Sequence, residues 1–399
     1  MQIPVNVQRI EPAYLEEAIP AQIADIIADL TAAATTLGHS LHPRSAANLA
    51  EAVRMMNTYY SNLIEGHNTR PRDIERALQG EFDDDKQRRN LQLEATAHIR
   101  LQAEIDATDA RGELSEPASA DWIRSLHRDF YKDAPREMLI IKSGDREIEM
   151  VPGEWRSKQE HDVQVGIHLP PASESVPEFM NYFEQRYRME PLGTGRRLLA
   201  MAAAHHRFNY IHPFLDGNGR ISRLMSYAMA HKAGIGSHGL WSISRGLAKG
   251  LQNKTEYKRL MQHADSPRQG DRDGRGNLSQ AALVEFTEWF LKVCLDQITF
   301  MAGLFDIATL SARLRRYAER KDSWKPEAAR LLEEALIRGQ FERGEAPRIT
   351  GLPERTARRV LSDVVADGLL DSETEKGPVS LRFPAKSLDT LFPALYPDS

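Results

Sequence analysis

The stretch HPFLDGNGRISR, His212 to Arg223, decides both the fold and the chemistry expected of this chain. It joins two segments with helical spacing of apolar residues, which predict one helix from about Gly195 to Tyr210 and another from about Asn218 to Lys232. A helix that begins in such a loop offers unpaired N–H groups and a partial positive charge to an anion. Gly217 and Gly219 let the backbone approach a diphosphate closely. The stretch therefore predicts an anion-binding loop between two helices.

The remaining polar residues of the stretch extend this prediction to a nucleoside triphosphate. Asn218 adds amide donors, and Arg220 and Arg223 lie three residues apart on one helix face, where two guanidinium groups could hold outer phosphate oxygens. Asp216 offers the hard carboxylate oxygen that Mg²⁺ prefers beside phosphates. His212 titrates near neutral pH and could take a proton from an attacking hydroxyl. Taken singly, the aspartate could be a helix N-cap and the arginines surface ion-pair partners. Together they favour the nucleotide site.

Composition indicates a folded protein of more than one domain. The 399 residues are too many for one ordinary core, and 41% hydrophobic with 27% charged residues is typical of globular chains. The formal net charge of -5 argues against attraction of the whole chain to nucleic acid. Cys294 has no second cysteine to pair with, and no basic leader or long apolar run stands out. We therefore expect a cytoplasmic protein with no membrane partner.

The pattern along the chain is mainly helical and divides into three regions. We expect a helical region over 1–115, a core over 116–305, and a distinct domain over 322–399 after the linker KDSWKPE. Alternation of β-branched and polar residues between Met138 and Pro171 predicts one or two short hairpins. The last region has the order helix, turn, helix, small hairpin, which is that of a winged helix-turn-helix.

The predicted second helix of the last region carries Arg355, Arg358 and Arg359. These could contact DNA, although acidic neighbours leave the region without a net basic field. DNA binding and docking of another protein both stay open.

HPFLDGNGRISR resembles the signature of the Fic family, H-x-F-x-D/E-G-N-G-R-x-x-R, at every defined position. The resemblance implies a helical Fic core that transfers AMP from ATP to a Ser, Thr or Tyr hydroxyl of a target protein, or of itself, with release of pyrophosphate. The roles it implies are the general base for His212, the magnesium ligand for Asp216, the anion hole for Gly217, Asn218 and Gly219, outer-phosphate contacts for Arg220, and the γ-phosphate contact for Arg223.

Two further segments look family-like. VQVGIHLPP resembles the Fic flap, a hairpin over about 161–171 that aligns a target segment by strand addition, and it makes Val165, Gly166 and His168 candidate contacts of the bound nucleotide. Tyr257 could line the adenine pocket, although a core role is an equal alternative for this residue.

SNLIEG, Ser61 to Gly66, resembles the Fic inhibitory motif, Ser/Thr-x-x-x-Glu-Gly/Asn. It lies on a helix expected over about 50–66, N-terminal to the core. A Glu65 carboxylate paired with Arg223 would occupy the guanidinium that should receive the γ-phosphate. The resemblance thus makes Ser61 and Glu65 regulatory residues of an autoinhibited enzyme.

Other readings of the site stay open at this stage. The branch of the family that phosphorylates its target carries lysine at the position of Gly219, so this glycine favours AMP transfer. An enzyme that mainly removes AMP, or a transcription regulator that only senses nucleotide through the Fic domain, is the alternative. The sequence leaves the target protein and the oligomeric state, including a homodimer, undetermined.

Overall fold

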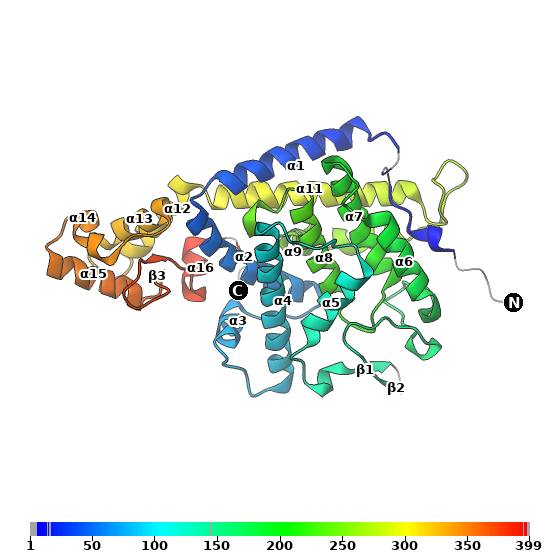
Figure 1. Ribbon diagram of the computed structural model, residues 1–399, viewed down its shortest axis with the longest axis horizontal. Helices are drawn as coiled ribbons and strands as arrows, with labels where there is room; N and C mark the ends of the chain where they lie inside the picture. The colour runs from blue at the N-terminus through cyan, green and yellow to red at the C-terminus, as the bar shows by residue number, and fades with distance from the viewer. Residues whose placement is uncertain (1–5, 14, 16, 144–145, 394, 397–399) are drawn as a thin grey trace.

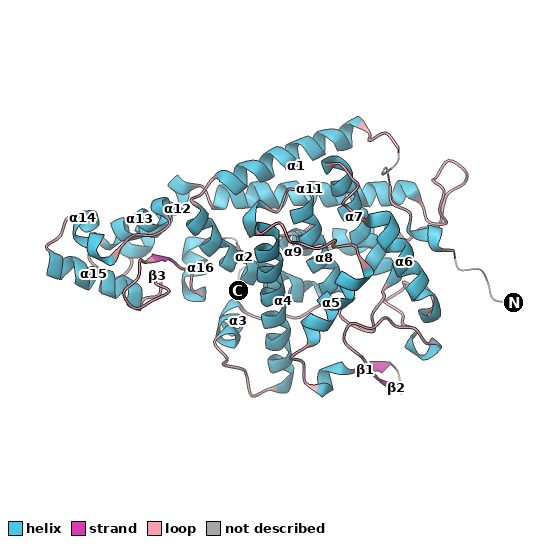
Figure 2. Ribbon diagram, viewed as in Figure 1, coloured by secondary structure: helices cyan, strands magenta, loops and turns pink. Residues whose placement is uncertain are grey.

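The computed structural model describes residues 6–13, 15, 17–143, 146–393 and 395–396. The fold is mainly helical, as the sequence predicts, with two small antiparallel strand pairs (Figure 2). The α-helices are α1 Ala21–His39, α2 Pro43–Ile64, α3 Pro71–Leu78, α4 Lys86–Ala110, α5 Ala120–Tyr131, α6 Val176–Tyr187, α7 Thr194–Ile211, α8 Asn218–Lys232, α9 Ile243–Lys249, α10 Glu256–His263, α11 Gln280–Leu304, α12 Ile307–Glu319, α13 Ala328–Arg338, α14 Ala346–Thr350, α15 Glu354–Ala366 and α16 Ala385–Leu391. The strands are β1 Ile140–Ser143, β2 Arg146–Glu149, β3 Leu370–Asp371 and β4 Ser380–Leu381, and short 3-10 helices span Val7–Ile10, Arg136–Leu139, Gln159–His161, Ser173–Ser175, Ser237–Gly239 and Arg343–Glu345.

Helices α7 and α8 pack against each other at the centre of the body (Figure 1). Most of their residues are buried because neighbouring helices cover them, and the buried residues of both helices include polar and charged side chains. Helices α4 and α5 cover one side of the pair, and α11 crosses α7 with α1 alongside it. The loop of interest therefore starts and ends in the most deeply buried pair of helices.

Local signals in the sequence explain the ends of several helices. Ser279 caps α11 by accepting a hydrogen bond from the N–H of Ala282 at 3.1 Å. Helix α2 is longer than the predicted 50–66, because Pro43 occupies its first position, where a missing N–H costs nothing. The helix ends at Ile64, and Gly66 follows with φ of 88°.

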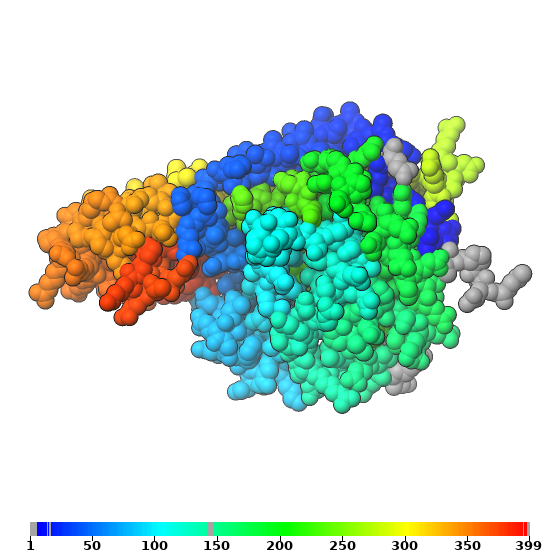
Figure 3. Space-filling model, viewed as in Figure 1, coloured from blue at the N-terminus to red at the C-terminus, as the bar shows by residue number. Residues whose placement is uncertain are grey.

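The C-terminal helices project from one end of the body (Figure 3). Helices α13, α14 and α15, followed by the pair β3–β4, have the order expected of a winged helix-turn-helix, and this assignment stays a prediction. The predicted linker KDSWKPE stays a prediction; its first residue, Lys321, pairs with Asp367 at 2.7 Å and lies over the ring of Tyr317, so this end of the segment packs against its neighbours.

The projecting region is attached to the body through the start of α2. Helix α13 and strand β4 both contact α2. The hydroxyl of Ser45 donates to the carbonyl of Leu336 at 2.7 Å, and Arg382 donates to the side chain of Asn48 at 2.6 Å. One helix thus contacts the C-terminal region at its start and reaches the predicted inhibitory motif at its end.

No described helix by itself is long and apolar enough to cross a membrane. Helices α11 and α12 meet the length and composition test only as a pair, which is bent by 53°.

Candidate active site

The loop between α7 and α8 is fixed by unusual backbone geometry at both ends. His212 caps α7 in the left-handed conformation, with φ of 50°, and its N–H donates to the carbonyl of Phe208 at 2.9 Å. Gly217 precedes α8 with φ of 79°. A left-handed histidine costs free energy that only the surrounding structure can offset, and such residues cluster at functional sites.

The side chain of Asn218 closes this loop on itself. Its Oδ1 accepts from the N–H of Phe214 at 2.9 Å, and its Nδ2 donates to the carbonyl of the same residue at 2.8 Å. The amide group that the sequence suggested as a phosphate donor is therefore engaged within the loop. Any phosphate contact of Asn218 has to come from its backbone N–H.

The two glycines of the loop are required for different steric reasons. A Cβ on Gly217 would lie 2.8 Å from the hydroxyl oxygen of Tyr131. A Cβ on Gly219 would overlap the carboxylate of Glu65. Gly217, the N-cap residue of α8, has no side chain that could bond to the N–H groups of the first turn. The carboxylate of Glu65 thus lies at the anion-binding end of α8.

Arg223 contacts both residues of the predicted inhibitory motif. Its Nη2 lies 2.6 Å from Oε1 of Glu65, and its Nε donates to the hydroxyl of Ser61 at 2.9 Å. The arginine side chain is 1% exposed and that of the glutamate 32%. Burial acts to raise the pKa of Glu65, but Arg223 and Arg220 more than offset it and the pKa is lowered. The pair is therefore ionised at neutral pH.

Arg220 also has a carboxylate partner, which the sequence did not indicate. Its Nη2 lies 2.8 Å from Oε2 of Glu94 on α4, and the two side chains are 7% and 10% exposed. A single glutamate in a charged helical segment usually lies on a solvated face, so nothing in its sequence context singled out Glu94. Both arginines of the loop are thus paired with glutamates from other helices.

His212 is held in the neutral form. Burial, together with Arg156 and His168, lowers its pKa to about 3. A hydrogen bond to the backbone of Asn209 opposes this shift. A neutral imidazole has one ring nitrogen that can accept a proton. The histidine is therefore in the protonation state that a general base needs at neutral pH.

Arg156 bonds to the backbone of His212 and was not singled out from the sequence. Its side chain is 1% exposed and donates to three backbone carbonyls, those of His212 at 2.6 Å, Ile211 at 2.9 Å and Pro171 at 2.6 Å. A fourth bond goes to the hydroxyl of Ser173 at 2.8 Å. One guanidinium group thus ties the end of α7 to the end of the predicted flap.

Asp216 is oriented by residues of α5. The Nε2 of His127 lies 3.2 Å from the backbone carbonyl of Asp216, and the hydroxyl of Tyr131 lies 3.4 Å from its Oδ2. The His127 ring stacks on Phe214, with centroids 3.7 Å apart. The carboxylate of Asp216 is only partly buried and has an open side, as a metal ligand beside phosphates requires.

The predicted flap is a tight turn and not a longer hairpin. Within it only Val165 and His168 pair, through two hydrogen bonds of 3.0 Å around Gly166, which has φ of 61°. The ring of His168 is anchored to the carbonyl of Tyr210 at 2.9 Å and to Asp265 at 3.0 Å. The ring of His168 is therefore directed toward the protein and not toward solvent.

The outer edge of the flap carries apolar side chains at alternate positions. Val165, Ile167 and Leu169 are 44%, 73% and 69% exposed. An exposed row of apolar side chains fits the predicted role in target alignment, which stays a prediction.

Tyr257 is both a core residue and part of a cavity wall. It is buried, and its hydroxyl is 2.8 Å from Nε2 of His205 on α7. Its ring also lines a cavity of about 1340 Å³ together with Leu63 and Ile64 of α2. None of the described residues lining this cavity belongs to the loop 212–223, so the cavity borders the phosphate site without containing it.

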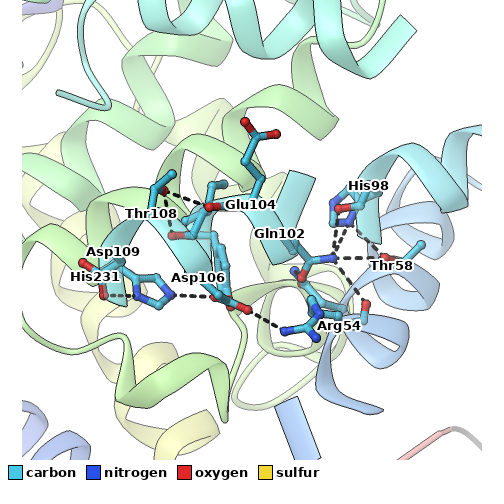
Figure 4. Close-up of polar contacts among 12 residues, drawn as sticks. Arg54, Thr58, His98, Gln102, Glu104, Asp106, Thr108, Asp109 and His231 are labelled. Carbon is cyan, nitrogen blue, oxygen red and sulfur yellow. Dashed lines mark hydrogen bonds and ion pairs between the residues drawn. The ribbon is translucent and has the colours of Figure 1, made fainter. Parts of the chain in front are cut away.

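A buried polar network on α4 holds α2 and α8 in place (Figure 4). Asp106 accepts from Arg54 of α2 at 2.7 Å and lies 3.2 Å from Nε2 of His231 on α8, whose Nδ1 lies 2.8 Å from Asp109. One turn back on α4, the side chain of Gln102 bonds to α2 as well. Because α2 carries Glu65 and α8 carries Arg223, this network supports the contact between them.

A family comparison agrees with this geometry: residues 117–230 match the Fic/DOC family. The chain contains a Fic domain. The match covers α5 to α8 and the loop, and falls inside the region 116–305 expected to form the core.

Curated relatives match the chain only locally. A segment of 82 residues is 39% identical to the protein adenylyltransferase Fic of Drosophila erecta and 38% identical to that of Aedes aegypti. Each match covers 21% of this chain and 16% of the relative, so the aligned part is about one sixth of those proteins.

Solved structures support the same fold over much more of the chain. A Fic family protein from Desulfovibrio desulfuricans G20 superposes with a TM-score of 0.54 at 16% identity, covering 93% of this chain and 98% of that one. A Fic domain containing signaling protein from Bacteroides thetaiotaomicron gives 0.51 at 20% identity, covering 69% and 95%. The helical Fic fold predicted from the sequence is thus confirmed.

Proposed function

We propose that this protein is an adenylyltransferase that moves AMP from ATP to a hydroxyl side chain of a protein, its own chain included. The observation that carries the proposal is the arrangement around the loop. A neutral His212, the uncapped first turn of α8 and two buried arginines lie together, and each has a use in phosphate transfer.

In the proposed reaction the hydroxyl oxygen of the target attacks the α-phosphorus of ATP. A new oxygen–phosphorus bond forms, the bond from the α-phosphorus to the bridging oxygen of the β-phosphate breaks, and pyrophosphate leaves with the electron pair. The free ring nitrogen of His212 accepts the proton of the attacking hydroxyl. The guanidinium groups of Arg220 and Arg223 offset the charge of the leaving pyrophosphate.

The residues present also fit a magnesium ion. Mg²⁺ is usually held by one or two carboxylates together with substrate phosphates, and Asp216 offers one partly buried carboxylate next to the phosphate-binding turn. When bound, the ion would neutralise phosphate charge and help to orient the phosphates. Among the described residues, no group of three or more His, Cys, Asp or Glu side chains could hold a metal without such phosphates.

The contact between Glu65 and Arg223 supports autoinhibition as part of this proposal. The carboxylate lies over Gly219, at the start of α8, and holds the arginine that should receive the γ-phosphate. ATP that binds while this pair is intact has its terminal phosphate displaced, so its α-phosphorus is not in line with the attacking hydroxyl.

The test is incubation with Mg²⁺ and ATP labelled at either the α- or the γ-phosphate. Label from the α-phosphate should appear on protein, and His212→Ala should abolish it. His238→Ala is a matched control, because His238 is an exposed histidine that also has positive φ, at 55°. Transfer of the γ-phosphate label to protein would refute AMP transfer and indicate phosphorylation.

Two alternatives can be distinguished from this proposal with the same protein. If removal of AMP dominates, a target that already carries AMP should lose it faster than unmodified target gains it. If the protein is a nucleotide-sensing regulator, the exposed arginines Arg355, Arg358 and Arg359 of α15 should bind duplex DNA with a strong salt dependence. Arg358 already pairs with Glu354 on the same helix, which leaves this face less basic than its arginines alone would make it.

A further inference from the structure

The pair formed by Glu94 and Arg220 has a geometry that leaves the arginine available for a second partner. The contact joins one Nη to one carboxylate oxygen, 2.8 Å apart, rather than two parallel bonds. The Nε of Arg220 is buried and has no hydrogen-bond partner in the described part of the chain. A buried guanidinium with an unused donor is incompletely satisfied.

The charges around Glu94 do not balance in the absence of a ligand. It faces Arg220 of α8, Asp216 of the loop, Glu65 at the end of α2 and the phenol of Tyr131 on α5. Three carboxylates thus share the site with the two guanidinium groups of Arg220 and Arg223.

This environment raises the pKa of Glu94 into the neutral range. Burial raises the pKa of its carboxyl to about 7, and the two neighbouring carboxylates add to this effect while Arg220 opposes it. Arg220 itself stays protonated, because its ion pairs outweigh its burial and raise its pKa.

We propose that Glu94 is a positioning residue of the nucleotide site: it holds Arg220 while the site is free of nucleotide and yields it to the phosphates when a nucleoside triphosphate binds. The inference rests on the proposed function only in that ATP binds at this loop. Phosphates that take over Arg220 remove the cation that pairs with Glu94 and add negative charge beside it. The carboxyl then takes up a proton as the nucleotide binds.

The experiment is calorimetric titration of the full chain with Mg²⁺ and ATP at about pH 8, in two buffers that differ in ionisation enthalpy. The difference in heat should correspond to uptake of up to about one proton per nucleotide, because a carboxyl with a pKa near 7 starts out mostly ionised at this pH. Glu94→Gln keeps the shape and an oxygen that can accept from Arg220, but it removes the charge. This variant should bind ATP about tenfold more tightly at about pH 8 and take up no proton.

Two comparisons separate this role from a merely structural one. Glu104→Gln makes the same chemical change on an exposed part of α4 and should leave affinity and proton uptake unchanged (Figure 4). The effect of Glu94→Gln should persist in a Glu65→Gly background, because the two glutamates hold different arginines.

The inference is overturned if Glu94→Gln binds ATP as the wild type does with the same proton uptake, or binds it more weakly. If ATP binds to neither the wild type nor the variants, both the proposed function and this inference fail. Proton uptake and affinity can both be read without any AMP transfer, so the two failures are distinguishable.

Discussion

Replacing Glu65 by glycine should convert this protein from a poor to an active adenylyltransferase. The carboxylate that is removed lies 2.6 Å from an Nη of Arg223, whose side chain is 1% exposed. A charge-assisted hydrogen bond of this kind is worth about 1.5 to 3 kcal/mol, which corresponds to a factor of roughly ten to a hundred in rate if it has to be broken before reaction. Because Arg223 keeps its bond to Ser61 at 2.9 Å, we expect the lower end of this range, at least about tenfold.

The substitution should leave the fold intact. Glu65 is the cap residue that follows Ile64, the last residue of α2, and the end of the helix is also fixed by backbone bonds from Gly66 to Leu63 at 3.0 Å and from His67 to Asn62 at 2.9 Å. Glycine can adopt the φ of -77° that Glu65 has, without steric strain. A change in activity can therefore be attributed to the freed arginine.

The assay is the rate of AMP incorporation into the natural target, or into the protein itself, measured with ATP labelled at the α-phosphate. ATP affinity is measured alongside it by calorimetry and should change much less than the rate. Glu51→Gln, an exposed carboxylate on α2, serves as the control. Glu65→Gly combined with Arg223→Ala should lose most of the gain. Equal AMP transfer by wild type and Glu65→Gly would refute the inhibitory role and leave the case for His212 standing.

Three further changes test other parts of the structure. Arg156→Lys keeps the charge but not the planar group that reaches four acceptors, so AMP transfer should fall at least about tenfold with the helical circular dichroism unchanged. Gly217→Ala should weaken ATP binding and lower the melting temperature by more than Gly234→Ala does. Both glycines have φ near 80°, but only at Gly217 would a Cβ lie against Tyr131. Equal effects of the two substitutions would exclude this contact as the cause. His231 has a pKa raised to about 9, because bonds to two aspartates of α4 outweigh its burial. Its protonated form therefore adds about 3 kcal/mol to the free energy of unfolding. This contribution is complete below the unfolded pKa of about 6.5 and is lost as the pH rises through about 9. His231→Gln should therefore lower the free energy of unfolding in urea at about pH 6 and have a much smaller effect at about pH 10.

The central helices and their loop could be predicted from the sequence because their signals are local. Periodicity places α7 and α8 within one residue of their observed ends, and the glycines mark the turn between them. The flap was predicted less well. Alternating residues indicate an extended segment, but they do not determine how many backbone hydrogen bonds form within it. In the flap, Val165 and His168 form two such bonds.

The supporting residues of the site could not be predicted, because their roles depend on burial. Glu94 lies 126 residues from Arg220 in sequence, and Arg156 lies 56 residues from His212. Isolated charged residues of this kind usually lie on the surface, and only the tertiary structure shows them inside. The contact of Glu65 with Arg223, 158 residues apart, was expected only because both ends belong to recognisable motifs.

The four hydrogen bonds of Arg156 determine when the active-site loop becomes ordered. They join the end of α7, the end of the flap and Ser173 through a group that needs no ligand. The conformational entropy of this end of the loop is therefore lost when the chain folds and not when a ligand binds. Under the proposed function, the nucleotide would bind next to a helix end that is already ordered, so the cost of ordering it would lower the stability of the fold and not the affinity for the nucleotide.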